Sequence, residues 1–294
     1  MLMLCVLAAS CQKENSPEPK NYTKFETDVI NLPVSVENNT LVFETEKDYQ
    51  LCLDLLGKAD TKQLNDFEKV LNFESLRNSD KSKELKDEDK LFLTLLNPQR
   101  SIIIANHIFT VNFDKERTYM SLYSEDNNLK SSKTLDFGWD DDVFEYLETG
   151  ERTLLKSNRF CKNDKESNYT WISGQPGYDF QVKALVRFKK YSIFSSIYFS
   201  LEQTVSSYYA PIVSGNYTTV SENYYRRKSG GRVSFSRTKP NTILSPNGKI
   251  HNRPYGASSR RLKEYRANVK FNINYTYNNQ YHSYYKTLLI ECHG

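Results

Sequence analysis

The segment Val269-Lys270-Phe271-Asn272-Ile273-Asn274-Tyr275-Thr276 gives the clearest indication of how the second half of this chain folds. Apolar and aromatic residues alternate with polar ones, which predicts a strand with one buried face and one wet face. The same alternation runs through residues 196–201 and 232–236, and Leu288-Leu289-Ile290 supplies a final strand. Antiparallel sheets have this pattern, and two of them packed face to face bury the apolar side of each. We therefore expect an antiparallel β-sandwich over residues 183–294.

Short stretches rich in glycine, proline and asparagine separate these strands. They are Gly230-Gly231, Pro240-Asn241, Pro246-Asn247-Gly248 and Pro254-Tyr255-Gly256. Each has the chemistry of a tight turn, so each is expected to connect two strands. A short helix is expected over residues 258–266, where it would cross over the sheets.

The first half of the chain begins with signals for a strand and a helix. Leu41-Val42-Phe43 is typical of a short strand. Thr45-Glu46-Lys47-Asp48 fits a capping box, in which a threonine and a carboxylate three residues later cap a helix. Apolar residues follow at helical spacing, and Gly57 is the expected stop. The inward positions of this helix are Tyr49, Cys52, Leu53 and Leu56.

Further helices and a small sheet are expected beyond this point. Helical spacing recurs over residues 61–71 and 91–96. Residues 101–104, 107–113 and 119–123 are rich in β-branched and aromatic side chains and predict a β-meander. The expected fold class is therefore α+β. An acidic domain of helices and a β-meander over residues 25–180 would precede the sandwich.

The first twenty residues indicate where the protein is located rather than how it folds. An apolar run meets the small residues Ala8-Ala9-Ser10 and then Cys11, after which the chain turns polar. This is the pattern of a secretion signal over residues 1–10, and the run is too short to span a bilayer. No basic residue precedes Lys13, so a start upstream of Met1 is expected. Leu7-Ala8-Ala9-Ser10-Cys11 resembles a bacterial lipobox, which implies that Cys11 is acylated and that residues 11–24 form a tether.

Cysteine usage argues against a scaffold held by many disulfides. Once Cys11 is lipidated, Cys52, Cys161 and Cys292 remain in the mature chain, so at most one disulfide forms. Cys52 lies among leucines and is expected to be a buried thiol. The sequence leaves open which of these three cysteines are paired.

The net charge of +4 hides a strong asymmetry between the two halves. Residues 183–294 hold 18 lysines and arginines against 4 acidic residues, whereas the residues before them hold 22 against 32. Such a split favours a region that faces a polyanion or a membrane. The alternative is that the two halves simply attract each other.

No catalytic or metal-binding pattern has the surroundings that its chemistry needs. Asp136-Phe137-Gly138 lacks the other kinase motifs, and Asp140-Asp141-Asp142 matches no calcium loop. The four histidines lie far apart, and no Cys-x-x-Cys pair exists. Serine-hydrolase, phosphate-loop and dinucleotide patterns are also missing. We expect no cofactor, no metal and no catalytic residue, and an enzyme acting on glycans is only the third hypothesis.

A basic, tyrosine-rich hairpin around Gly230-Gly231 is the most distinctive constellation. Arginine forks suit sulfate, phosphate and carboxylate groups, and tyrosine faces suit sugar rings. Arg253, Arg260 and Arg261 would extend this patch. A solvated loop kept for solubility is the alternative interpretation. The expected ligand-binding residues are Tyr224, Tyr225, Arg226, Arg227, Lys228, Arg232 and Arg237.

The order of these segments resembles a group of uncharacterised outer-surface lipoproteins from gut anaerobes. The matching features are the lipobox, the strand that runs into a capped helix, Leu95-Leu96-Asn97 before an isoleucine-rich meander, and a basic β region that ends in Leu289-Ile290-Glu291-Cys292-His293-Gly294. The resemblance implies a lipid anchor and a surface-exposed place on a bacterial outer membrane, and it implies no activity.

The residues themselves predict a non-catalytic binding module for a glycan or another polyanion, with nucleic acid not expected as a partner. The alternative is a structural or assembly subunit that self-associates, in which the acidic half of one molecule docks the basic half of another.

Overall fold

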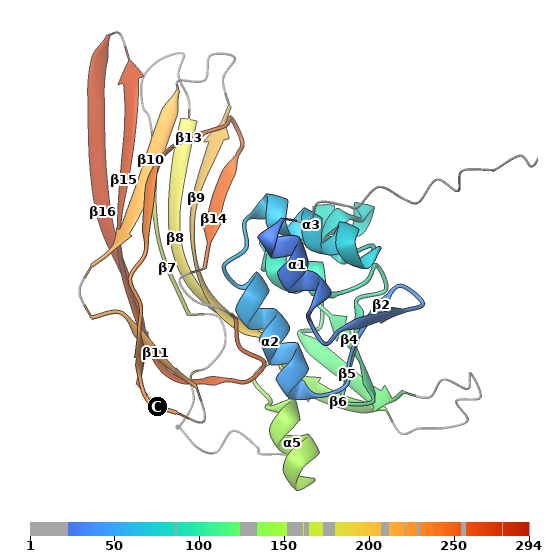
Figure 1. The fold of residues 1–294 in the computed structure, drawn as a ribbon. Coiled ribbons are helices and arrows are strands. Elements are labelled where there is room, and N and C mark those ends of the chain that lie inside the picture. The colour runs from blue at the N-terminus through green and yellow to red at the C-terminus, as the bar shows by residue number, and fades with distance from the viewer. Residues whose placement is uncertain are drawn as a thin grey trace, which may run out of the picture.

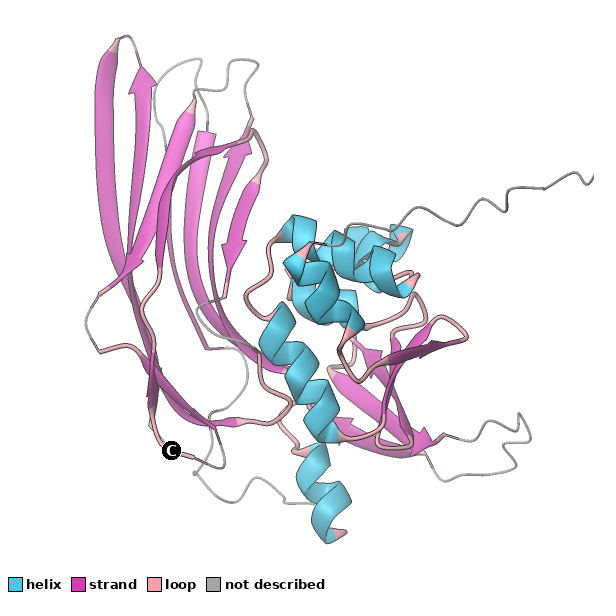
Figure 2. Ribbon diagram, in the orientation of Figure 1, coloured by secondary structure: helices cyan, strands magenta, loops and turns pink. Residues whose placement is uncertain are grey.

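The chain folds into helices and three sheets, with 22% helix and 48% strand, which confirms the α+β class (Figures 1 and 2). The computed structural model describes residues 23–85, 87–123, 134–151, 161, 165–172, 180–206, 212–220, 222–227, 230–253, 257–277 and 279–293. The predicted signal and Cys11, Lys228 and the predicted turn at residues 254–256 lie outside them. Among the described residues, no helix is long and apolar enough to cross a membrane.

The first sheet has six strands that follow one another in chain order. Only β2 and β3 pair in parallel, and the later strands form the predicted meander. Ala105 and Asn106 both have positive φ, as a two-residue hairpin turn requires. The strands are β1 (Ser35–Glu37), β2 (Thr40–Phe43), β3 (Ser101–Ile104), β4 (His107–Asn112), β5 (Arg117–Leu122) and β6 (Leu135–Gly138).

The helices lie beside this sheet, and α1, α2 and α3 gather together (Figure 1). The capping box at Thr45 and Asp48 is present, and Gly57 caps the other end of that helix, as predicted. Helix α3 spans the predicted residues, and Asp60 and Gln63 cap its start. The α-helices are α1 (Lys24–Ile30), α2 (Glu46–Leu56), α3 (Thr61–Leu71), α4 (Lys90–Leu95) and α5 (Val143–Thr149), with short 3-10 turns at Leu76–Asn78 and Asp80–Glu84.

Two antiparallel sheets make up the rest of the chain. The first runs in the order β14-β9-β8-β7, and the second runs in the order β12-β11-β15-β10-β13, with β16 also paired to β15. Their strands are β7 (Lys165–Ile172), β8 (Phe180–Lys190), β9 (Ser195–Val205), β10 (Val213–Thr219), β11 (Tyr224–Arg227), β12 (Val233–Ser234), β13 (Thr238–Leu244), β14 (Lys249–Asn252), β15 (Leu262–Tyr277) and β16 (Gln280–Cys292).

Apolar side chains from both of these sheets form one hydrophobic core. Val186 and Phe199 come from the first of these two sheets. Val269, Phe271 and Ile273, from the alternating segment at residues 269–276, come from the second. All five are fully buried, as their alternation predicts. A disulfide joins Cys161 to Cys292 and so ties the end of β16 to the segment before β7. Cys52 is the buried free thiol that the sequence predicts.

We call residues 24–149 the helical lobe and residues 165–292 the β lobe, because each has its own core. The tip of the β8–β9 hairpin crosses from one to the other. Tyr191, Ile193 and Phe194 at this tip are buried in the core of the helical lobe. The ring of Tyr191 lies 4.4 Å from that of Phe92 and 4.9 Å from that of Trp139. Strand β7 packs in the β lobe, although the predicted domain boundary assigns it to the acidic domain over residues 25–180. The division into two domains itself stays a prediction.

Several local predictions are wrong. Residues 258–266 form no helix, because the long strand β15 begins at Leu262. Pro240-Asn241 is not a turn but lies inside β13, an edge strand where the missing proline N–H costs no ladder bond. Val233 is 48% exposed rather than buried.

Strand β9 also departs from the expected alternation. Ser196, Tyr198 and Ser200, which the alternation predicts to be wet, are buried like their apolar neighbours. The reason is local: the Tyr198 hydroxyl donates to the Asp87 carbonyl oxygen, and Ser196 donates to Asp89. Both acceptors belong to the helical lobe, which covers this face of the sheet.

Candidate functional site

Opposite charges join the two lobes. Arg253 of the β lobe donates through Nε and Nη2 to the carboxylate of Asp89, and both side chains are almost completely buried. Asp89 also caps α4 by accepting from the Leu91 backbone N–H. The Tyr191 hydroxyl donates to Glu88 at 2.5 Å, and Lys189 lies 3.6 Å from the same carboxylate. At this contact, basic residues of the second half of the chain therefore pair with acidic residues of the first half within one molecule.

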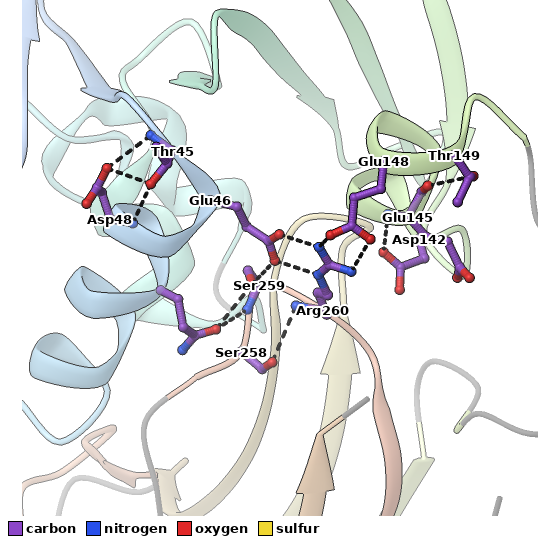
Figure 3. Close-up of polar contacts among 11 residues, drawn as sticks. Thr45, Glu46, Asp48, Asp142, Glu145, Glu148, Thr149, Ser258, Ser259 and Arg260 are labelled. Atoms are coloured by element: carbon purple, nitrogen blue, oxygen red, sulfur yellow. Dashed lines mark hydrogen bonds and ion pairs between the residues drawn. The ribbon is translucent and has the colours of Figure 1, made fainter. Parts of the chain in front are cut away.

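A cleft of about 610 Å³ lies next to this joint. Its centre is Arg260, which forms ion pairs with Glu46 at the start of α2 and with Glu148 of α5 (Figure 3). The Ser259 hydroxyl donates to Glu46 at 2.7 Å, and the Ser259 N–H donates to Gln50 at 2.9 Å. Two carboxylates in a cleft are what a glycosidase needs. Here the guanidinium lies between them, so a glycosidic bond has no place between acid and base.

Lys190 is fully buried beside this joint, at the end of β8. Its ammonium donates to the carbonyl oxygens of Trp139 and Asp141 at 3.0 and 2.5 Å. Burial first, and then the charge of Arg261, lower its pKa to about 7, against the opposing effect of Asp142, Asp140 and Asp141. The acidic triplet is structural, because Asp141 accepts from the Gly138 N–H and Asp142 caps α5.

The predicted basic hairpin is present, but carboxylates occupy its arginines. Strands β11 and β12 pair around Gly230-Gly231. Arg226 and Arg232 both form ion pairs with Glu264 of β15, at 3.1 and 2.6 Å. Their hydrogen bonds, that of Arg232 first, lower the pKa of the Glu264 carboxyl. Arg227 forms an ion pair with Asp54 of α2 at 2.7 Å.

The rest of the hairpin offers little free charge. The guanidinium of Arg232 lies 4.4 Å from the ring centre of Tyr224, and that of Arg227 lies 5.9 Å from the ring centre of Tyr225. Both tyrosines are half-buried. Arg237 is half-buried on the segment before β13, where its backbone N–H donates to the Thr219 hydroxyl. The structure therefore engages the side chains of Arg226, Arg227 and Arg232 in internal contacts, while no ion pair of Arg237 is found among the described residues.

An aromatic groove lies where the edges of the two β sheets meet. Strand β7 ends the first sheet and β16 lies at an edge of the second, and the two strands are in contact. The groove between them has a volume of about 400 Å³. It is lined by Tyr169, Thr170, Trp171, Ile172, Phe180, Tyr275, Tyr284 and Tyr285.

The strand registers explain why aromatic rings gather in this groove. Trp171 pairs with Val182, and Tyr284 pairs with Ile273, so both rings point to the inner side of their sheets. The rings pack on one another: Tyr169 against Trp171 at 5.1 Å, and Tyr275 against Tyr284 at 6.0 Å. Burial, and then the hydrogen bond with Tyr284, raise the pKa of Tyr275 to about 12.

The groove keeps its rings accessible, a lysine lies beside it, and its described lining contains no carboxylate. Tyr284 and Tyr285 are 43% and 70% exposed. None of the described residues that line the groove is acidic. The Lys286 ammonium lies 4.8 Å from the centre of the Tyr169 ring. In the described part of the chain, no group of acidic residues, histidines and cysteines could hold a metal ion.

Sequence reasoning missed this groove, although a signal for it exists. Tyr169 and Trp171 lie two residues apart, as do His282 and Tyr284, so each pair projects from one face of a strand. Nothing in the sequence shows that β7 and β16 become edges that meet. No family model matches the chain, and no curated protein matches it.

Proposed function

We propose that this protein is a non-catalytic glycan-binding module that holds a sugar chain in the aromatic groove between β7 and β16. The observation that carries this proposal is the set of accessible rings in a groove that has no described carboxylate. Sugar rings have faces of C–H groups with hydroxyls around the rim. Tyrosine and tryptophan match them, because each offers a rigid apolar face and a polar group at its edge.

The basic hairpin is a less favourable glycan-binding site than the groove. A ligand that binds Arg226 or Arg232 has to displace Glu264, which would then be left as a buried carboxylate without its partners. Leaving a buried charge unpaired costs more than an exposed ion pair contributes. The rings of the groove meet no such competition.

We also propose that the protein is anchored through lipid on Cys11 and works outside the cytoplasm of a bacterium, on its outer surface. The sequence supports this through the lipobox, and the Cys161–Cys292 disulfide adds support because such bonds persist in oxidising compartments. A β-sandwich of the two sheets would serve as the rigid scaffold. The core that both sheets share supports this arrangement.

The internal ion pairs weaken the alternative function as an assembly subunit. That function needs basic groups of one molecule to meet acidic groups of another. Arg227, Arg253 and Arg260 already meet acidic residues of the helical lobe in the same chain. No contact among the described residues indicates that these arginines would pair with a second copy of the chain instead.

A glycan array tests the proposed function. The probe is the full chain with Cys11→Ser, so that no lipid is attached, and array hits are followed by titration. Tyr285→Ala is expected to weaken binding about tenfold, since stacking on one aromatic ring contributes roughly 1–3 kcal/mol in comparable ring–ring contacts.

Tyr281→Ala is the matched control for this experiment. Tyr281 lies on the same strand and is 69% exposed, but it does not line the groove. Its substitution should leave the affinity unchanged. Binding to no glycan, or equal losses from both variants, would reject the groove as a glycan site.

A further inference from the structure

We infer that the glycan held in the groove is acidic, and that Lys286 is the residue that selects its carboxylate or sulfate group. This inference rests on the proposed function, since it assigns a ligand class to the same groove. It depends on the position of one ammonium group, which has no ion pair among the described residues, and on a described groove lining without a carboxylate.

The backbone register places Lys286 on the groove side of its sheet. Lys286 pairs with Phe271, whose side chain is fully buried between the two sheets. Paired residues of neighbouring strands point to the same face. Lys286 therefore projects from the inner face at the edge of the sheet, toward β7, where its ammonium lies over the ring of Tyr169.

The charge on Lys286 has no carboxylate partner among the described residues. In the described part of the chain, the contact of its ammonium is with the Tyr169 ring. The arginines of the same lobe are different, since Arg226, Arg227, Arg232, Arg253, Arg260 and Arg266 each form at least one ion pair. Of the described hairpin arginines, Arg237 alone has no ion pair, so most of their charge is already paired, whereas the charge of Lys286 remains for an external anion at the groove.

The contact with Tyr169 also fixes where an anion would bind. A cation over an aromatic face is held by the ring quadrupole and loses part of its hydration. Tyr169 lines the groove, so a sugar that packs on the neighbouring rings brings its substituents close to the ammonium. An anionic group there gains a charge-assisted hydrogen bond, which a neutral hydroxyl forms more weakly.

Pairs of polysaccharides that differ only in charge test this inference. The probes are polygalacturonate beside its carboxyl-reduced form, and a sulfated galactan beside its desulfated form. The protein is the full chain with Cys11→Ser. At least one acidic polymer should bind about fivefold more tightly than its neutral form at low salt, and added salt should reduce the difference.

Lys286→Gln should remove this preference while the neutral form still binds. Lys239→Gln is the matched control, because Lys239 lies on β13, does not line the groove and has no ion pair in the described structure. Strand β13 pairs with β10, on the other side of β15 from β11 and apart from the β16 edge that carries Lys286. Lys239→Gln should keep most of the preference.

The outcomes separate the two proposals. Equal binding of acidic and neutral forms, or an equal loss of preference in both lysine variants, overturns the role of Lys286 and leaves glycan binding intact. If no polymer binds here and no glycan binds on the array, the proposed function and this inference both fail.

Discussion

Single residues show why the surplus of positive charge in the β lobe is not free for a ligand. Arginine forms several directed hydrogen bonds to a carboxylate, and here its forks meet Glu46, Glu148, Glu264 and Asp89. Lysine carries a compact charge on a flexible stem, and Lys270 and Lys286 lie over tyrosine rings instead. The paired arginines therefore form internal contacts, whereas Lys286 leaves its charge open to a ligand.

The pair of Arg253 and Asp89 is expected to be essential for stability. Arg253→Met would leave the Asp89 carboxylate buried without its cation, which costs about 3–5 kcal/mol. Chemical denaturation measures this loss. The double variant Arg253→Met, Asp89→Asn should recover part of it, because the unpaired charge is gone. A single variant as stable as the parent would mean that the pair does not hold the lobes together.

Lys190 is expected to make stability depend on pH. Its pKa is lowered to about 7 in the folded protein, by burial first and then by Arg261, whereas in the unfolded chain it is near its ordinary value of 10.5. Between these values the unfolded chain binds more protons, so the free energy of unfolding should rise as pH rises above 7.

Denaturation of the parent and of Lys190→Met at pH 7 and pH 9 tests this. The parent should be more stable at pH 9, and the variant should show a smaller difference. An equal difference in both proteins would assign the pH dependence to other groups.

At the level of elements, the two β sheets approach each other closely at Gly215. Gly215 of β10 pairs with the inward residue Ile273 and therefore faces the other sheet. A Cβ atom there would lie 2.8 Å from Leu201 Cδ1 of β9. A side chain at this position would have to displace the buried Leu201 side chain, whereas the backbone angle of Gly215 is not an unusual one.

Gly215→Ala should therefore destabilise the protein by about 1–3 kcal/mol through overpacking. The matched control is Gly231→Ala in the hairpin, where no atom lies within 4 Å of the added Cβ. Thermal unfolding of both variants measures the difference. If the two substitutions have the same small effect, the sheets do not pack as tightly as the core indicates.

Elements with strong local signals could be predicted from the sequence, and elements defined by long-range pairing could not. The capping box at Thr45 and the alternation around Phe271 are local, and both are confirmed. Ser196 and Ser200 look like wet positions, yet the helical lobe covers them. The groove has the same limitation, because Trp171 and Tyr284 meet only when the edges of two sheets meet.

In the molecule as a whole, the charge asymmetry holds the two lobes together. Arg227, Arg253 and Arg260 reach from the β lobe to carboxylates of the helical lobe, and the aromatic tip at Tyr191 inserts beside them. The sequence presented two explanations for the asymmetry, an external polyanion and attraction between the halves. The ion pairs favour attraction between the halves as the explanation for the paired arginines. An external polyanion remains the explanation that we propose for Lys286.

One titration separates the groove from the hairpin as the place where a glycan binds. A glycan that binds the full chain with Cys11→Ser is titrated into that protein, into Tyr284→Ala and into Arg232→Ala, with calorimetry as the measurement. Both side chains are exposed at 43% and 57%, so both variants should fold. A site in the groove requires that Tyr284→Ala weakens binding about tenfold while Arg232→Ala leaves it unchanged. Loss of binding in Arg232→Ala with full binding in Tyr284→Ala would contradict it and place the ligand on the basic hairpin.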